Sequence, residues 1–119
     1  MDASKILMVD DATVNLRVLR TALDGCGYRL FTAKGGPSAL SIAAKARPDL
    51  ILLDILMPGI DGYEVCRRLK ADETVRHIPV IFLTALGDAA DEARGLALGA
   101  VDYITKPIHP DLVRARVRT

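Results

Sequence analysis

Five side chains able to take part in phosphoryl or metal chemistry stand at the ends of short apolar runs. They are Asp10, Asp11, Asp54, Thr84 and Lys106. Runs of this kind are typical of buried parallel strands. In open α/β sheets the carboxyl ends of the strands line one crevice, where ligands bind. We therefore expect these five residues, distant in sequence, to meet at one edge of a sheet.

Three carboxylates in one crevice repel each other and raise one another's pKa unless a cation joins them. A hard divalent ion such as Mg²⁺ binds carboxylate oxygens and keeps positions open for water and phosphoryl oxygens. Lys106 adds a positive charge suited to a transferring phosphoryl group. Three carboxylates, a divalent ion and Lys106 together predict a site in which an ionised aspartate attacks phosphorus.

Each of these residues alone also has a structural explanation. Asp10 and Asp11 can cap the helix expected to follow them, and Asp54 can be a turn residue. Thr84 is β-branched, which suits packing at a strand end, and Lys106 can be a solvated lysine. Their coincidence at successive strand ends favours the functional interpretation.

The chain reads as five repeats of a strand followed by a helix, which predicts a doubly wound parallel α/β sheet. The expected strands cover residues 6–9, 29–33, 50–53, 80–83 and 102–105. The expected helices cover residues 13–23, 37–46, 62–70 and 88–98, with a last helix from residue 110. The second strand partly alternates between polar and apolar residues, which predicts an edge position.

Composition indicates one domain and excludes two classes of partner. The 119 residues are 50% hydrophobic, with 16 Lys plus Arg against 15 Asp plus Glu and a net charge of +1. No basic field exists for nucleic acid or an anionic membrane surface. No apolar stretch approaches the ~18 residues of a membrane span. We expect a cytoplasmic protein whose two cysteines, Cys26 and Cys66, are reduced and buried.

Four blocks of sequence resemble the receiver domains of two-component response regulators. They are V-D-D at 9–11, L-L-D-I-L-M-P-G-I-D-G at 52–62, F-L-T-A at 82–85 and D-Y-I-T-K-P at 102–107. The resemblance covers essentially the whole chain. It implies a flavodoxin-like (βα)5 fold in three layers, with strand order 2-1-3-4-5, as a single receiver domain over residues 1–119.

The resemblance also implies a role for each site residue. Asp54 would accept a phosphoryl group from a histidine kinase or phosphotransfer protein. The expected ligands of Mg²⁺, or of Mn²⁺, are Asp11, Asp54, the backbone carbonyl of Leu56 and, through water, Asp10. Residues that would contact the phosphoryl group or respond to it are Lys106, Thr84 and Tyr103.

The expected output surface is formed by the helix at 88–98, the strand at 102–105 and the last helix. Arg114, Arg116 and Arg118, beside Asp88, Asp91 and Glu92, can make it a charged homodimer face. The last helix still shows an apolar pattern at Thr119, so we expect a piece of a longer response regulator or hybrid protein with an output domain. Leu56 and Leu86 cannot orient water by hydrogen bonding, which predicts slow self-dephosphorylation.

Three other functions remain open from sequence. A Mg²⁺-dependent phosphohydrolase with an aspartate nucleophile usually has a general acid two residues after that aspartate, whereas Asp54 is followed by Leu56 at that spacing. A flavin module would need backbone amides and hydroxyls where this chain has D-D-A-T-V-N. A phosphorylation-independent scaffold would not need the acceptor set. We expect a switch that assists its own phosphorylation and dephosphorylation but is not a metabolic enzyme.

Overall fold

The computed structural model describes residues 4–85 and 89–118, with the backbone alone for residues 89–92. The strands of this part are β1 (Lys5–Val9), β2 (Arg29–Ala33), β3 (Leu50–Asp54), β4 (Val80–Thr84) and β5 (Asp102–Thr105). The helices are α1 (Thr13–Leu23), α2 (Gly36–Ala46), α3 (Gly62–Ala71), α4 (Ala89–Ala97) and α5 (Pro110–Arg118).

The strands form one parallel sheet in the order β2-β1-β3-β4-β5, which confirms the predicted flavodoxin-like order. The register aligns their carboxyl ends. Val9 pairs with Leu53, Asp54 pairs with Leu83, and Thr84 pairs with Thr105. The residues that end or follow these strands are therefore brought to one edge of the sheet.

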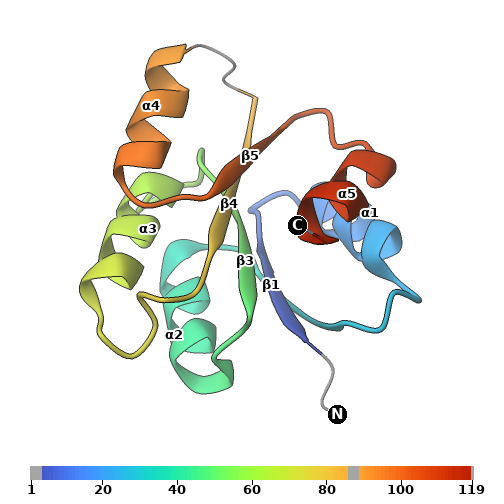
Figure 1. Cartoon of the computed structure of the whole chain (residues 1–119), viewed down its shortest axis with the longest axis horizontal. Helices are drawn as coiled ribbons and strands as arrows, with labels where there is room; N and C mark the ends of the chain where they lie inside the picture. Colours follow the sequence, from blue (N-terminus) through green and yellow to red (C-terminus); the bar gives the residue numbers. More distant parts are fainter. Residues whose placement is uncertain (1–3, 86–88, 119) are drawn as a thin grey trace.

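Helices cover both faces of the sheet, giving three layers. Figure 1 shows α2, α3 and α4 on one side and α1 and α5 on the other. Alternate strand residues supply the two cores because successive side chains of a strand point to opposite faces. Leu7 and Leu53 belong to the core under α2 and α3, whereas Met8 and Leu52 belong to the core under α1 and α5. Complete apolar runs are the sequence pattern that this two-sided burial requires.

Most predicted boundaries coincide with the observed ones, and the others differ by one residue. β2 is the least buried of the first four strands and lies at a sheet edge, as its mixed pattern predicted. The predicted helix at 88–98 appears as α4 over Ala89–Ala97, and its expected first residue lies outside the described part. None of the helices in the described ranges is long and apolar enough to cross a membrane.

The prediction that both cysteines are buried is wrong for Cys26. Cys66 is buried in α3, but Cys26 is exposed in the turn that follows α1. Gly25 and Gly27, on either side of it, both have positive φ angles. The chain has therefore left the helix before Cys26, so the apolar pattern of α1 no longer implies that this residue is buried.

Candidate functional site

Asp54 and Asp10 lie side by side at the carboxyl ends of two paired strands. Asp54 is the last residue of β3 and Asp10 directly follows β1. Both are buried, with 2% and 0% of their surface exposed. One carboxylate oxygen of Asp10 accepts a hydrogen bond from the N–H of Ala12 at 2.9 Å, which shapes the turn into α1. The helix-capping prediction is thus partly right, because Asp10 shapes this turn although the N-cap itself is Ala12.

The predicted acidic cluster is present. Ligand oxygens of Asp10, Asp11 and Asp54 all lie within 4.8 Å of one another, and Asp11 is the exposed member. The other carboxylate oxygen of Asp10, Oδ2, is buried and has no hydrogen-bond partner among the described residues. Buried polar atoms without a hydrogen bond are rare, and this one has instead the ammonium group of Lys106 as an ion-pair partner.

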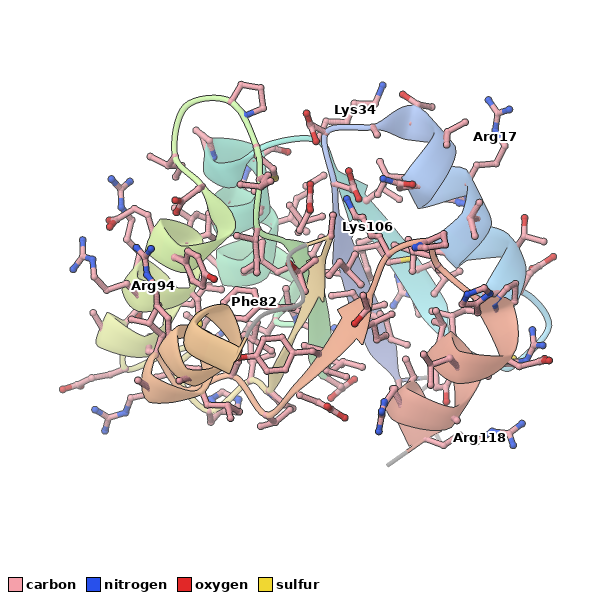
Figure 2. All side chains as sticks on the ribbon, turned by 90° about the horizontal axis from the view of Figure 1, so that it is seen from above. Arg17, Lys34, Phe82, Arg94, Lys106 and Arg118 are labelled. Atoms are coloured by element: carbon pink, nitrogen blue, oxygen red, sulfur yellow. The ribbon has the colours of Figure 1, made fainter. Side chains whose placement is uncertain are left out.

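Lys106 reaches both buried carboxylates from the segment after β5. Its Nζ lies 3.0 Å from Asp54 Oδ1, with hydrogen-bond geometry, and 3.1 Å from Asp10 Oδ2 as an ion pair. Figure 2 shows Lys106 between the two helical layers, near the ends of the strands. Burial opposes the charge of this lysine, but Asp54 and Asp10 together raise its pKa above the ordinary value.

The charge of this group suits a divalent cation. Asp10, Asp11 and Asp54 carry three negative charges when ionised, and Lys106 offsets one of them, which leaves two. The available atoms are carboxylate oxygens, which Mg²⁺ and Mn²⁺ prefer. The residues present therefore fit the metal ion that the sequence predicted.

Burial is the largest influence on the acidity of Asp54. The pKa of this carboxyl is raised from 3.8 to about 6, mainly by burial and also by the nearby charge of Asp10, while the hydrogen bond from Lys106 acts in the opposite direction. At neutral pH the carboxylate is mostly ionised, which a nucleophile requires. A buried carboxyl with a perturbed pKa is a common feature of functional sites.

Thr84 and Lys106 are joined through the backbone. Thr84 ends β4 and is buried, and its carbonyl oxygen accepts a hydrogen bond of 2.7 Å from the N–H of Lys106. The peptide bond that follows Lys106, to Pro107, is cis. The hydrogen bond between Lys106 and Thr84 attaches the backbone that carries the lysine to the strand that carries the threonine.

Tyr103 lies away from the acidic cluster, in the core beneath α4. It is half-buried and pairs with Phe82 across β4 and β5. The two ring centroids are 6.3 Å apart. Phe82 also contacts Tyr63 of α3 edge to face, with centroids 5.4 Å apart. Tyr103 thus belongs to a row of three aromatic rings that runs from β5 to α3.

Gly62 is a site residue whose role sequence reasoning missed. It begins α3, and its N–H donates to the carbonyl oxygen of Ile55 at 2.7 Å. A Cβ at Gly62 would lie 2.7 Å from Ile55 Cα and closer still to the carbonyl oxygen of Asp54. The loop after β3 therefore returns onto the backbone of Asp54, and only glycine permits this approach. The I-D-G ending of the second sequence block, at residues 60–62, was the available indication.

Leu56 lies in this loop, and 59% of its surface is exposed. Leu86, the other residue predicted to be unable to orient water, lies outside the described residues. An exposed apolar side chain two residues after Asp54 offers no hydrogen bond to an incoming water molecule.

Comparison with known proteins agrees with this architecture. Residues 6–118 match the family described as response regulator receiver domain. Over 117 residues the chain is 50% identical to response regulator PleD of Caulobacter vibrioides, covering 98% of this chain and 26% of that protein. It is 45% identical to the probable transcriptional regulator ycf27 of Cyanophora paradoxa, covering 100% of this chain and 48% of that protein.

Solved structures show the same fold. A response regulator structure from Chloroflexus aurantiacus, titled putative, superimposes with a TM-score of 0.92 at 36% identity, covering 98% of this chain and 95% of that one. Chemotaxis response regulator CheY4 of Vibrio cholerae gives a TM-score of 0.92 at 29% identity, covering 98% and 97%. The chain belongs to the response regulator receiver domain family, whose members act in two-component signalling. The chain spans about a quarter of the length of response regulator PleD and about half of the length of the ycf27 regulator.

Proposed function

We propose that this domain is a phosphorylation switch in which Asp54 accepts a phosphoryl group in a Mg²⁺- or Mn²⁺-dependent reaction. One observation supports this most. The buried Asp54 carboxylate lies within 4.8 Å of two other carboxylates and receives a hydrogen bond from Lys106 at 3.0 Å. A nucleophile, a set of metal ligands and a cation for the phosphoryl group therefore lie together.

The donor we propose is a phosphohistidine on a histidine kinase or phosphotransfer protein. A carboxylate oxygen of Asp54 attacks the phosphorus and forms an acyl phosphate. The P–N bond breaks, and its electron pair leaves with the imidazole ring of the donor. Lys106 Nζ, already in contact with Asp54 Oδ1, is within reach to donate a hydrogen bond to a phosphoryl oxygen.

The proposed metal ligands are Asp11, Asp54 and the backbone carbonyl of Leu56, with Asp10 acting through water. When bound, the ion would supply positive charge against the negative charge of the phosphoryl oxygens. Asp10 is the most buried of the three carboxylates, whereas Asp11 is exposed. This difference supports a direct role for Asp11.

The proposed route of the response runs from Thr84 to Tyr103 and then to the face formed by α4, β5 and α5. Thr84 is next to the acceptor site through its backbone bond to Lys106, and Tyr103 lies under α4. Hydrogen exchange of backbone amides in α4, β5 and α5 should change on phosphorylation. Unchanged exchange across all three elements would refute this route.

The wider context is also a proposal. The length of the relatives supports a longer response regulator or hybrid protein in which this single domain precedes or follows an output region. We propose a cytoplasmic location for that protein. A homodimer through α4, β5 and α5 remains a hypothesis. Arg116 pairs with Asp102 at 3.5 Å and Arg114 pairs with Asp111, so these arginines have partners within the domain. The acidic residues expected to face them are not among the described side chains.

Intact mass spectrometry tests the switch directly. The chain is incubated with acetyl phosphate and Mg²⁺, beside an Asp54→Asn variant and a chelated sample. A gain of one phosphoryl group only in the wild type with metal is expected. No gain under any condition would overturn the proposal in favour of a phosphorylation-independent scaffold. Steady hydrolysis of phosphate esters would instead favour the phosphohydrolase.

A further inference from the structure

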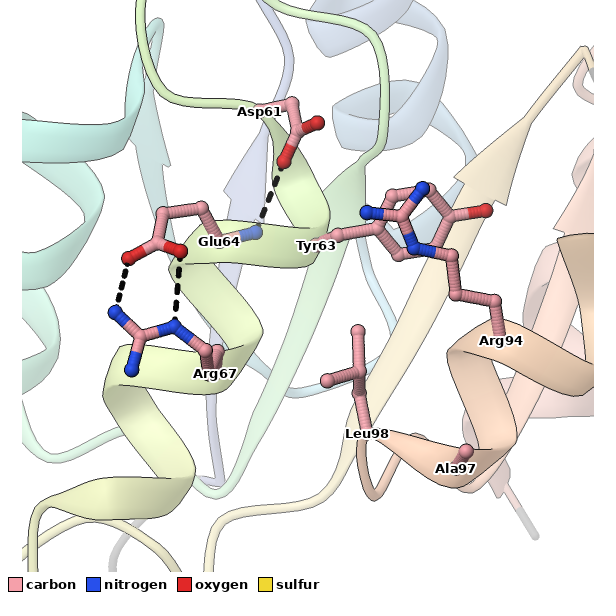
Figure 3. Close-up of a pocket in the computed structure, with 7 residues that line it drawn as sticks. All are labelled: Asp61, Tyr63, Glu64, Arg67, Arg94, Ala97 and Leu98. Carbon is pink, nitrogen blue, oxygen red and sulfur yellow. Dashed lines mark hydrogen bonds and ion pairs between the residues drawn. The ribbon is translucent and has the colours of Figure 1, made fainter.

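A pocket of about 360 Å³ opens between α3 and α4, away from the acidic cluster. Its apolar lining comes from Tyr63, Ala97 and Leu98. Charged residues of both signs surround this lining, as Figure 3 shows. The pocket has room for one or two side chains of a partner, and no role described so far uses it.

The acidic groups of this pocket are already used within the domain. Asp61 caps α3, accepting a hydrogen bond of 2.9 Å from the N–H of Glu64. Glu64 accepts hydrogen bonds from Arg67 Nε at 2.9 Å and from Arg68 Nε at 2.7 Å. These hydrogen bonds, that from Arg67 first, lower the pKa of Glu64 to about 2. Its carboxylate therefore stays ionised and bound to arginine at ordinary pH.

Arg94, unlike the acidic groups of the pocket, stacks on an aromatic ring. Its guanidinium lies over the ring of Tyr63, with its central carbon 4.1 Å from the ring centroid (Figure 3). Among the described side chains, no carboxylate lies within ion-pair distance of it. Stacking uses the flat face of a guanidinium and leaves its N–H groups pointing outward in the plane. The ring therefore fixes the orientation of a cation whose hydrogen-bond donors remain available.

The guanidinium group of Arg94 is thus the charged group of the pocket that still has hydrogen-bond donors to offer. We propose that the α3–α4 pocket is a docking site for an acidic segment of a partner protein. A Glu or Asp side chain of that segment would pair with Arg94, and a neighbouring apolar side chain would rest on Ala97 and Leu98. A carboxylate matches the two parallel donors of an oriented guanidinium. This site does not require phosphorylation of Asp54, so its test uses the unphosphorylated domain.

The test is an NMR titration of the ¹⁵N-labelled chain at constant ionic strength. The probe is acetyl-Leu-Glu-Leu-amide, and acetyl-Leu-Gln-Leu-amide and inorganic phosphate are the comparisons. We expect the glutamate peptide to give saturable shifts of the Arg94 Nε–H signal and of amides in α3 and α4. The glutamine peptide should bind about tenfold more weakly, because charge-assisted hydrogen bonds are roughly twice as strong as neutral ones.

Two variants complete the test. Arg94→Gln should weaken binding of the glutamate peptide about tenfold, and Arg94→Lys should weaken it by less because the charge remains. Arg118→Gln is the matched control, since Arg118 is an exposed helical arginine that Figure 2 shows far from Arg94. Equal binding of the two peptides, binding unchanged in Arg94→Gln, or the same shifts with phosphate alone would overturn the proposal.

Discussion

Gly95 of α4 and the hydroxyl group of Tyr103 in β5 are in such close contact that a Cβ on the glycine would lie 2.6 Å from the tyrosine oxygen. The same Cβ would lie 2.9 Å from a ring carbon of Phe82, which is completely buried. Only a residue without a side chain lets α4 approach the two rings this closely. The position of α4 and the position of Tyr103 are therefore linked.

We predict that Gly95→Ala destabilises the domain by about 1 kcal/mol, although alanine is favoured over glycine in helix interiors by a similar amount. The clash with two rings outweighs this preference, because Phe82 has no free space into which to move. Urea unfolding followed by circular dichroism measures the change.

Repeating Gly95→Ala in a Tyr103→Phe variant distinguishes the contributions of the two rings, because Tyr103→Phe removes the nearest clashing atom. The penalty of Gly95→Ala should fall to about half there, as expected for residues in direct contact. An unchanged penalty would show that the hydroxyl group of Tyr103 does not determine how closely α4 approaches.

Asp54 should make the stability of the domain depend on pH in metal-free buffer. Its pKa is raised from 3.8 to about 6, so the folded state binds more protons than the unfolded state between these values. Stability contributed by this group therefore falls as pH rises from about 4 to 6. Asp54→Asn should be more stable than the wild type at pH 7, by on the order of 1 to 3 kcal/mol, and the gap should shrink at pH 4. Urea unfolding at both values tests this, and a gap independent of pH would contradict it.

Lys106 should matter most when no divalent ion is present. Lys106→Ala leaves Asp54 and Asp10 without their cation, which should cost about 2 kcal/mol at pH 7. Added Mg²⁺ should recover part of this loss, because it brings positive charge to the same carboxylates. Thermal unfolding with and without Mg²⁺ measures both effects. Lys45→Ala, at an exposed position of α2, is the matched control and should change little. Equal destabilisation with and without Mg²⁺ would argue against a metal at this cluster.

Gly62→Ala should be among the most destabilising small substitutions, at about 3 kcal/mol. Its Cβ would lie 2.7 Å from Ile55 Cα, and backbone cannot move aside as a flexible side chain can. Gly35→Ala is the control, because no atom lies within 4 Å of a Cβ there. We expect it to stay within about 1 kcal/mol of the wild type. Similar losses for both variants would mean that the loop after β3 can shift.

Leu56→Asn should speed the loss of phosphate from Asp54. The exposed leucine offers no hydrogen bond to an attacking water molecule, whereas an amide at this position does. We expect an increase of a few-fold up to about tenfold in the rate, followed by intact mass after removal of acetyl phosphate. Leu56→Met, which keeps an apolar side chain, should leave the rate nearly unchanged. No acceleration in the asparagine variant would exclude this position from orienting water.

The strands of the sheet could be predicted because the burial of each strand requires a local pattern of apolar residues. Strands buried on both faces need runs such as LILL and VIFL, and the polar residues that follow mark the carboxyl ends. Once these strands are parallel, Asp10, Asp54 and Lys106 must share an edge. The expected acidic cluster follows from that geometry alone, and the structure confirms it.

Other features depend on distances between elements that no local pattern encodes. Gly62 and Gly95 each permit a close approach between segments, but a glycine in sequence reads equally well as a turn or as a weak helix position. The stacking of Arg94 on Tyr63 joins α3 and α4, which are separated along the chain by β4. Cys26 was misassigned because the apolar pattern of α1, which ends at Leu23, was extended into the glycine-rich turn that follows it.

The contact of Lys106 with Asp10 and Asp54 has a consequence for how the domain behaves in solution. A dissolved cation leaves its site when it is diluted or chelated, but the ammonium group of Lys106 is tethered to the same chain. Its effective concentration at the two carboxylates is therefore set by the fold rather than by the surroundings. The two buried aspartates therefore keep a counter-ion through dialysis, dilution and changes of salt, because Lys106 cannot diffuse away from them.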